Sequence, residues 1–245
     1  GVYTLSRHYA LPVCGTGGHI FPALAVSEKV EKDWNIHWLG VQQRLDSKFV
    51  PRKYNLLNLK LETPKKNIFI IFQYLKILFS TFTVTKILKE KKINLVFTTG
   101  GYISAPTILA AKLLKIPVII HESNLIPGTV TKYFGFLCKY VLIGFKDTKS
   151  YLKNCKTIFT GTPLRQEFYK TNLLPDWVPR GQGPLIIVMG GSQFAKRINE
   201  IFYESLKFFK KQNYRVVHIV GENNLNISVK TKYNNYIQKI GRAHV

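Results

Sequence analysis

The stretch CGTGGHIFPALAV, from Cys14 to Val26, places a glycine-rich turn directly before an apolar helical pattern. Turns of this kind open helices with free backbone N–H groups, and they usually bind phosphate. A phosphate turn needs only backbone and space, so the imidazole of His19 indicates proton chemistry as well. The stretch therefore predicts both the start of an α/β unit and a candidate reactive site.

The same motif occurs three times: a strand pattern is followed by a double glycine, and a helical pattern begins directly after it. The copies are VCGTGGHI at 13–20, FTTGGYIS at 97–104 and IVMGGSQF at 187–194. In an open parallel sheet such turns lie at the carboxyl ends of strands, where ligands bind. A single double glycine is also common in ordinary strand-to-helix turns. Three copies predict a ligand with several phosphates, held between two domains.

Short apolar runs alternate with helical patterns along the chain, which predicts an α/β fold with a parallel sheet covered on both faces. The proline- and glycine-rich residues 171–184 predict a linker, after which a second strand–helix unit begins. The expected strands are 35–41, 55–61, 93–99, 116–123, 140–145, 156–161 and 214–221. The expected helices of the first part are 20–32, 67–91, 103–115 and 127–138.

The charge balance is strongly basic, since 245 residues carry 36 Lys and Arg against 13 Asp and Glu, a formal net charge of +23. Such a surface attracts phosphates, acidic lipids or nucleic acid. Only eight of the basic residues are Arg, the side chain preferred for bidentate contacts to bases and phosphates. We therefore expect an anionic membrane or ligand as the partner and no nucleic acid.

The compartment is suggested by the cysteines and by the absence of long apolar runs. Cys14, Cys138 and Cys155 are widely spaced and form no Cys-x-x-Cys pair, so neither a disulfide framework nor a zinc site is predicted. The amino-terminal residues lack the apolar core of a secretory signal, and no stretch has the about 18 apolar residues that a membrane span needs. We expect a cytoplasmic protein.

Residues 65–92 are unusually apolar and aromatic for one buried helix face, and lysines bracket the stretch at both ends. This composition is typical of a surface that dips into a membrane interface while cations meet anionic headgroups. Phe72, Phe79 and Phe82 are the predicted membrane contacts. The alternative is a wide core-facing helix over a parallel sheet, which is often this apolar.

Six motifs in a fixed order resemble the MurG family of bacterial cell-wall glycosyltransferases: GTGGHIFPALAV, WLGVQQRLDSKFVP, FTTGGYISAP, IIHESNLIPG, GTPLR and VMGGSQ. The resemblance implies the GT-B architecture of two Rossmann-like domains. Residues 1–165 are then the acceptor- and membrane-facing domain, and residues 166–245 part of a donor domain for the UDP-sugar. The implied reaction transfers N-acetylglucosamine from UDP-N-acetylglucosamine to lipid I, forming lipid II for peptidoglycan, at the inner face of the plasma membrane.

The implied reaction inverts the sugar and needs no metal or cofactor. A base must take the proton of the acceptor hydroxyl, and positive groups must stabilise the departing diphosphate. A metal-dependent transferase would need a carboxylate pair such as Asp-x-Asp, and none occurs among the four aspartates. Helix N-termini and an arginine can replace the metal.

The resemblance also assigns residues one by one. His19 is the candidate catalytic base, with a cap or loop anchor as the alternative. The expected contacts to the donor UDP-N-acetylglucosamine are Thr16, Gly17, Gly18, Asn124, Arg165, Ser192 and Gln193. The loop expected on the acceptor diphosphate is Gly100, Gly101 and Tyr102. His121 and Glu122 are interpreted as structural because they end a buried strand, and His8, His37, His218 and His244 as bystanders.

The chain departs from the family pattern in three places. Before the first glycine loop, where the family has a clean apolar strand, SRHYALPVC offers few strand-forming residues and a proline. Phe194 stands where the family has another glycine, and it would crowd a phosphate at that helix start. The donor domain stops at 245, and 240–245 is expected to be a non-native junction, so we expect this chain to be inactive.

Two alternative functions stay open: a related GT-B transferase with another lipid acceptor, and a non-catalytic membrane-binding remnant. A redox Rossmann protein is disfavoured, because the first loop is not G-x-G-x-x-G.

Overall fold

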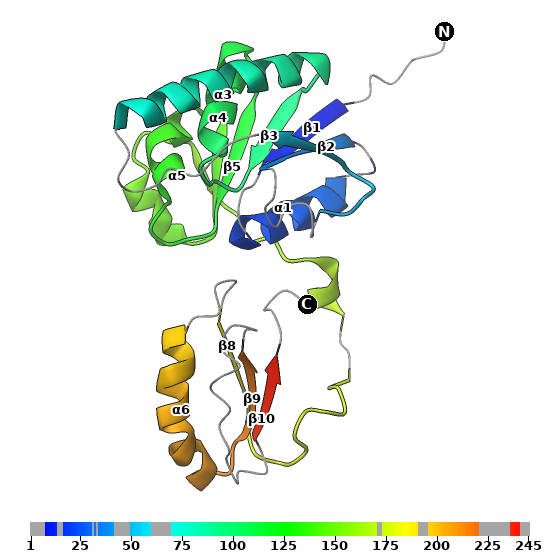
Figure 1. The fold of residues 1–245 in the computed structure, drawn as a ribbon, viewed down its shortest axis with the longest axis vertical. Coiled ribbons are helices and arrows are strands. Elements are labelled where there is room, and N and C mark those ends of the chain that lie inside the picture. The colour runs from blue at the N-terminus through cyan, green and yellow to red at the C-terminus, as the bar shows by residue number, and fades with distance from the viewer. Residues whose placement is uncertain are drawn as a thin grey trace. The chain divides into compact units, whose positions relative to one another are not determined.

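The computed structural model describes residues 8–13, 17–30, 32, 34–41, 50–59, 70–170, 173–190, 196–220 and 236–240. The chain divides into two compact units, Gly1–Tyr169 (unit 1) and Lys170–Val245 (unit 2), and each is described by itself. Figure 1 labels the elements of both units.

Unit 1 is built on a seven-stranded parallel sheet with the strand order β3-β2-β1-β4-β5-β6-β7. The order reverses between β1 and β4, so these neighbours send their following helices to opposite faces and leave a crevice beyond their carboxyl ends. The strands are β1 His8–Val13, β2 Trp34–Val41, β3 Asn55–Leu59, β4 Leu95–Thr98, β5 Val118–Glu122, β6 Tyr140–Ile143 and β7 Thr157–Phe159.

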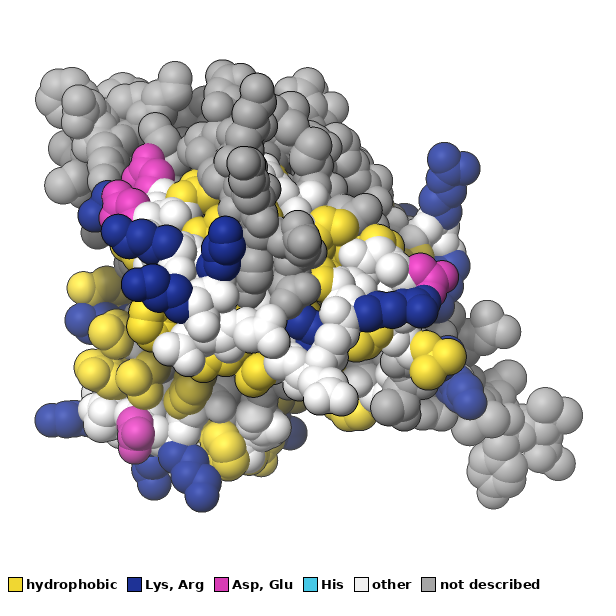
Figure 2. All heavy atoms as spheres, turned by 90° about the horizontal axis from the view of Figure 1, so that it is seen from below, with side chains coloured by type: hydrophobic (Ala, Val, Ile, Leu, Met, Phe, Trp, Pro, Cys, Tyr) yellow, Lys and Arg dark blue, Asp and Glu magenta, His cyan; other side chains and the backbone are white. Residues whose placement is uncertain are grey.

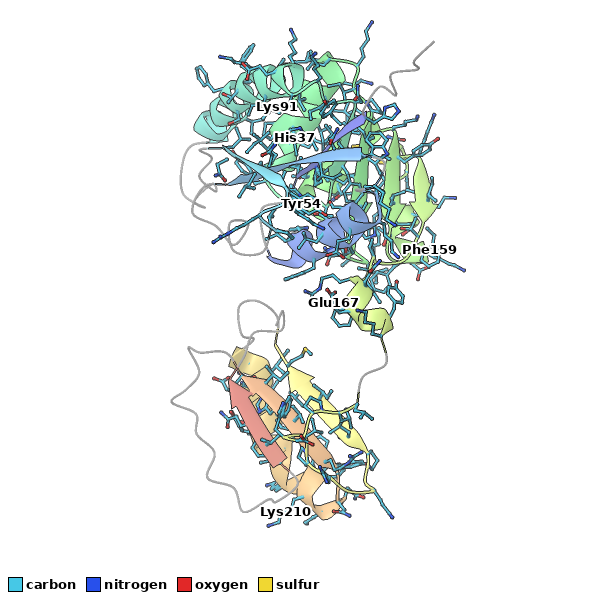
Figure 3. All side chains as sticks on the ribbon, turned by 90° about the vertical axis from the view of Figure 1, so that its right-hand side faces the viewer. His37, Tyr54, Lys91, Phe159, Glu167 and Lys210 are labelled. Atoms are coloured by element: carbon cyan, nitrogen blue, oxygen red, sulfur yellow. The ribbon has the colours of Figure 1, made fainter. Side chains whose placement is uncertain are left out.

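Helices cover both faces of this sheet, as buried parallel strands require. Among the described residues of this unit, the α-helices are α1 Gly17–Val30, α3 Ile70–Glu90, α4 Ser104–Leu113 and α5 Thr129–Phe134, and the 3-10 helices are η1 Gly135–Leu137, η2 Lys146–Tyr151 and η3 Gln166–Tyr169. One core joins α3 and α4 to the sheet, and the other joins α1 to the opposite face. In Figure 3, His37 lies on the α3 side of the sheet and Tyr54 on the α1 side. The α/β class predicted from the alternation is confirmed.

The apolar stretch around 65–92 forms the long helix α3, which begins on the same side of unit 1 as α5 (Figure 1). Val84 and Leu88 are buried in the core, whereas Phe79 and Phe82 are each 72% exposed. The helix therefore has a buried face, as the core-facing alternative expects, and an exposed aromatic face, whose contact with a membrane stays a prediction. The side chain of Phe72 lies outside the described residues.

The expected helix 127–138 is shorter and changes type. Gly128, in an extended conformation, caps α5, which continues as the 3-10 helix η1 after Phe134. At the junction, a Cβ on Gly135 would lie 3.1 Å from the Sγ of Cys155, so only glycine fits against this neighbour without a shift. Glycine is a poor α-helix former and 3-10 turns are common at α-helix ends, which agrees with a change of type at this residue.

Unit 2 contains a three-stranded parallel sheet in the order β10-β9-β8, with α6 Lys196–Lys211 packed against it. The strands are β8 Leu185–Met189, β9 Arg215–Val220 and β10 Tyr236–Ile240. β10 ends at the first residue of the suspected junction, and 241–245 lie outside the described residues. His218 on β9 is fully buried, with Nε2 3.0 Å from Asn199 Oδ1 and Nδ1 3.3 Å from the Tyr236 hydroxyl.

Among the charged side chains drawn in Figure 2, Lys and Arg predominate over Asp and Glu, and hydrophobic side chains lie between them. In the part of the chain that the structure describes, none of the helices combines the length and the apolar character needed to cross a bilayer. Within the same residues there is no cluster of three or more His, Cys, Asp or Glu side chains that could hold a metal ion.

Candidate active site

The turn between β4 and α4 contains the second double glycine and lies at the crevice where the strand order reverses. Gly100 and Gly101 have φ angles of +90° and +87°, which residues with a Cβ adopt only with strain. The backbone N–H of Gly100 donates to Thr98 Oγ1 at 3.2 Å, and Ser104 Oγ donates to the Gly100 carbonyl at 2.7 Å. Thr98 Oγ1 also donates to the carbonyl of Val13 at 3.0 Å. The turn is therefore held to the end of β1.

His19 lies in the first turn of α1 and faces this glycine turn. A Cβ built on Gly100 would lie 3.6 Å from Cε1 and 3.9 Å from Nδ1 of His19, which is ordinary contact distance. Thr99 Oγ1 donates to the backbone carbonyl of His19 at 2.7 Å, so the main chain of His19 is anchored without use of the imidazole. Two of the three predicted glycine turns thus meet through His19 and Gly100.

Glu122 ends β5 with a carboxylate that is only 3% exposed. Its Oε1 accepts from the backbone N–H of Asn124 at 3.0 Å and from Asn124 Nδ2 at 2.8 Å. Its Oε2 accepts from the backbone N–H of Gly128 at 2.9 Å and from Thr131 Oγ1 at 2.7 Å. Buried carboxylates need such donors, because an unpaired buried charge is costly. The four bonds fold the β5–α5 loop around one side chain and fix the amide of Asn124.

His121, beside Glu122, has a different environment. Its Nε2 lies 2.8 Å from the carbonyl of Gly161, which can only accept, so neutral His121 carries its proton there. Ser123 Oγ lies 3.2 Å from Nδ1 and donates to it. Burial lowers the pKa of His121 below its usual value, although the Gly161 bond and the charge of Glu122 act in the other direction. These contacts agree with a structural role.

A cavity of about 850 Å³ joins these elements at the carboxyl end of the sheet (the carboxyl-edge cavity). Burial raises the pKa of the Tyr102 phenol, which lies in its wall and therefore stays protonated at neutral pH. The lining residues are His19, Ile77, Gly100, Gly101, Tyr102, Ala105, Glu122, Asn124, Gly128, Thr129, Val130, Thr131, Tyr133 and Phe134. Most of this wall is apolar, and its polar groups come from the turns after β4 and β5.

Arg165 is not among the lining residues, although it is close to α1. Its Cζ lies 4.7 Å from the ring centroid of Phe21 on α1 and 5.4 Å from that of Phe168 on η3. Cation–π contacts of this kind hold a guanidinium in place. The buried Nε atom of Arg165 has no hydrogen-bond partner, so this residue retains a donor.

The structure thus brings together five of the predicted residues: His19, Gly100, Gly101, Tyr102 and Asn124. Gly17 and Gly18 form the first two positions of α1, next to His19. Thr16, Ser192 and Gln193 lie outside the described residues, as does Phe194.

Sequence reasoning did not identify the polar support of this site or its apolar wall. Glu122 was interpreted as structural, which its burial agrees with, but its carboxylate also holds the candidate ligand residue Asn124. Thr131 completes that network from α5. The available signal was a carboxylate at the end of a buried strand, followed within six residues by an asparagine and a Pro-Gly pair.

Family models match both parts of the chain. Residues 9–143 match the glycosyltransferase family 28 N-terminal domain, and residues 185–242 match the glycosyltransferase family 28 C-terminal domain. The first match covers the seven-stranded unit from β1 to β6, and the second covers the strands of unit 2.

Curated relatives in Prochlorococcus marinus are similar over most of this chain. The proteins of strain MIT 9515 and of subsp. pastoris strain CCMP1986 are 82% and 80% identical over 225 residues. Both are named UDP-N-acetylglucosamine--N-acetylmuramyl-(pentapeptide) pyrophosphoryl-undecaprenol N-acetylglucosamine transferase. Each alignment covers 92% of this chain and 62% of the relative, so the chain spans less than two thirds of their length.

Solved structures share the fold at lower identity. MurG of Acinetobacter baumannii is 24% identical with a TM-score of 0.69, over 96% of this chain and 66% of that chain. A putative UDP-N-acetylglucosamine 2-epimerase of Listeria monocytogenes is 9% identical with a TM-score of 0.66, over 97% of this chain and 69% of that chain. Similarity at this level concerns the fold alone, since one fold hosts several functions.

Proposed function

Since the chain belongs to glycosyltransferase family 28, we propose that it serves the transfer of N-acetylglucosamine from UDP-N-acetylglucosamine to lipid I, the undecaprenyl-diphosphate-linked acceptor of peptidoglycan synthesis. Names of relatives that are 80% identical or more support this substrate pair. The observation that carries the proposal is the meeting of His19, the Gly100–Gly101 turn and Asn124 around one cavity.

His19 is the proposed base. Its imidazole takes the proton of the acceptor hydroxyl while that oxygen bonds to the anomeric carbon of N-acetylglucosamine. The bond from this carbon to the diphosphate breaks, UDP leaves with the electron pair, and the configuration inverts. The Thr99 bond holds the main chain of His19, and this arrangement leaves the imidazole to face the cavity. General-base catalysis needs such a positioned side chain, and imidazole is the group most often used.

The glycine turn is proposed to hold the acceptor diphosphate. Positive φ angles turn the backbone of Gly100 and Gly101 at the start of α4, where the helix dipole favours negative charge. The absence of side chains lets a phosphate approach the backbone closely. Oriented N–H groups stabilise anionic oxygens, so this turn can hold the acceptor diphosphate.

Asn124 and Arg165 are the proposed donor contacts within unit 1, with Thr16, Gly17 and Gly18 beside them. Because Asn124 Nδ2 uses one of its two hydrogens on Glu122, Asn124 can offer a ligand its Oδ1 as acceptor and its second N–H as donor. Arg165 offers guanidinium donors to phosphate. In unit 2, Ser192 and Gln193 remain proposed contacts to the UDP phosphates, and the assignment of acceptor and donor roles to 1–165 and 166–245 is part of the same proposal.

A peripheral place on an anionic membrane, at its cytoplasmic face, completes the proposal. Phe79 and Phe82 are exposed on α3, and Lys76, Lys86 and Lys89 lie on the same helix. Apolar side chains among lysines suit the interface of an acidic bilayer. Nucleic acid is not proposed as a partner.

Acceptor binding tests the proposal on unit 1 directly. A lipid I analogue with a short lipid chain is titrated by calorimetry, against the same lipid without the diphosphate-linked sugar and against a diacylglycerol. We expect saturable binding of the lipid I analogue alone, and a loss of at least about 10-fold in affinity for Gly101→Ala, because a side chain there strains the phosphate turn. Equal binding of diacylglycerol would support the transferase with another lipid acceptor instead.

Because this chain spans only 62% of its relatives and is expected to be inactive, turnover by a full-length version tests the role of His19. If the imidazole is the base, His19→Ala lowers the rate of transfer from UDP-N-acetylglucosamine by about 100-fold or more and changes acceptor affinity little. If His19 is only a loop anchor, both quantities fall together. Asn124→Ala is the matched variant, because it removes a proposed sugar contact and should raise the KM for the donor more than it lowers kcat.

A further inference from the structure

A second exposed apolar surface, separate from that of α3, borders the carboxyl-edge cavity at Tyr133. It consists of Leu125 and Ile126 in the β5–α5 loop, Tyr133 on α5 and Phe136 on η1, and we call it the α5 rim. These side chains are 43%, 67%, 60% and 58% exposed, all within twelve residues of sequence. Single exposed apolar residues are normal on a surface, but such a concentration indicates contact with a partner.

The α5 rim and the exposed residues of α3 border the same cavity. Ile77 on α3 and Tyr133 on α5 both line it, and the next residues along α3, Leu78 and Phe79, are exposed. Figure 1 shows α5 and the start of α3 on the same side of unit 1. The cavity is therefore bracketed by outward-facing apolar side chains from two separate elements.

The charge around the rim has one sign. Between residues 91 and 146 the only acidic residue is Glu122, and its buried carboxylate is engaged by four hydrogen bonds. The basic residues of this stretch are Lys91, Lys92, Lys112, Lys115, Lys132, Lys139 and Lys146. No carboxylate in this stretch therefore opposes the approach of an anionic surface.

Lysines and tyrosines alternate beside the rim. Lys132 Nζ lies 5.7 Å from the ring centroid of Tyr133, and Lys139 Nζ lies 5.8 Å from that of Tyr140. Such side chains place an apolar body against lipid while their polar ends stay at the headgroup level. The composition suits the interface of a bilayer better than a protein groove, which would need acidic groups to match these lysines.

From these observations we infer that the α5 rim is a second bilayer-contact surface, which together with α3 makes the carboxyl-edge cavity open onto the headgroup region of an anionic membrane. The inference rests on the proposed function, since it gives a lipid-linked acceptor a route into the cavity without leaving the bilayer. Ile126, Tyr133 and Phe136 insert into the interface, and Lys132 and Lys139 meet the lipid phosphates.

Vesicle partitioning tests the rim. The chain is floated with phosphatidylcholine vesicles that contain phosphatidylglycerol, and with vesicles that lack it. The triple variant Ile126→Ser, Tyr133→Ser, Phe136→Ser should bind the anionic vesicles at least about 10-fold more weakly than the wild type, because insertion scales with apolar area. The matched control carries Tyr151→Ser, Ile158→Ser and Phe159→Ser, which are similarly exposed residues of the same unit, and should bind as the wild type does.

A single tryptophan variant gives a second test, because the triple variant could lose vesicle binding simply by failing to fold. Phe136→Trp should show tryptophan fluorescence that is quenched by brominated lipids, whereas Phe159→Trp should not exceed the quenching of the native tryptophans.

Normal vesicle binding by the rim triple, or no added quenching in Phe136→Trp, overturns the inference. If Phe79→Ser, Phe82→Ser abolishes binding while the rim triple does not, only α3 contacts the membrane and the proposed function stands. If the wild type does not bind anionic vesicles, the membrane part of the proposed function fails with it.

Discussion

The two ends of the seven-stranded sheet each carry a cavity, and only one of them is lined by the predicted site residues. The carboxyl-edge cavity measures about 850 Å³ and is walled by turns and helix starts. The amino-edge cavity measures about 600 Å³ and is lined by Tyr9, Trp34, Asn35, Ile36, His37, Lys53, Tyr54 and Asn55. Most of this lining belongs to the strands β1, β2 and β3 themselves. The volumes of the two cavities do not by themselves indicate which of them binds a ligand.

The difference lies in how the polar groups are held. At the carboxyl edge, Glu122 accepts four hydrogen bonds and Thr98 joins the Gly100 turn to β1. At the amino edge, the buried Nδ1 of His37 has no hydrogen-bond partner among the described residues, and burial, aided by the nearby Lys91, lowers the pKa of this histidine. The hydrogen-bonded polar groups thus lie beyond the carboxyl ends of the strands and not at their amino ends. Ligand sites in such sheets generally lie at the carboxyl ends.

The largest expected effect comes from breaking the network of Glu122. Glu122→Ala leaves two backbone N–H groups and the donors of Asn124 and Thr131 without their acceptor, so we expect a loss of about 4 kcal/mol in unfolding free energy. Urea unfolding of the chain measures it. Glu167→Ala, an exposed carboxylate on η3 that is labelled in Figure 3, should change stability by less than about 0.5 kcal/mol. A similar small loss in Glu122→Ala would mean that the network does not hold the loop.

The next largest effect is expected at His218, a buried histidine of unit 2 that belongs to neither cavity. Burial lowers the pKa of His218 in unit 2 from 6.5 to about 4. The unfolded chain therefore takes up a proton that the folded chain resists, so stability is full above pH 6.5 and is lost as the pH falls toward 4. We expect a loss of about 3 kcal/mol over this window, and a clearly flatter pH dependence in His218→Gln. Equal pH profiles of the two proteins would contradict the assignment.

A smaller effect on stability is expected from substituting glycines at the carboxyl edge. Gly101→Ala forces a side chain into φ +87°, and we expect a cost of about 2 kcal/mol. Gly128→Ala is the matched control, because Gly128 has φ −62° and an added Cβ would lie 3.7 Å from the nearest atom, Glu122 Oε2. The control should be neutral or slightly stabilising, since alanine restricts the unfolded chain. Thermal unfolding of both variants decides the point.

The smallest effect is expected at the amino edge. His37→Leu removes a buried ring nitrogen that has no partner, so stability should stay the same or rise by up to about 1 kcal/mol. The same measurement on His121→Leu, at the carboxyl edge, should show a loss, because Gly161 and Ser123 then lose their partner. A comparable loss for both histidines would remove the distinction between the two edges.

The fold was predictable from sequence because buried parallel strands and double-glycine turns leave clear patterns, as at 97–104. The placement of His19 against Gly100 agrees with the loops that the family resemblance indicated. The network of Glu122 could not be predicted, because its donors are mostly backbone groups and one threonine whose positions depend on the path of the loop. Likewise, periodicity did not show which face of α3 is buried: packing on the sheet buries Thr81 and leaves Phe82 exposed.

The central claim is that the carboxyl-edge cavity, and not the amino-edge cavity, receives the diphosphate-linked acceptor. The most direct measurement is an NMR titration of the labelled chain with a short-chain lipid I analogue, following the amides of Gly100, Gly101 and Asn124 and the ring of His37. We predict saturable shifts at the three carboxyl-edge amides and none at His37. Shifts at His37 without shifts at the glycine turn would contradict the account.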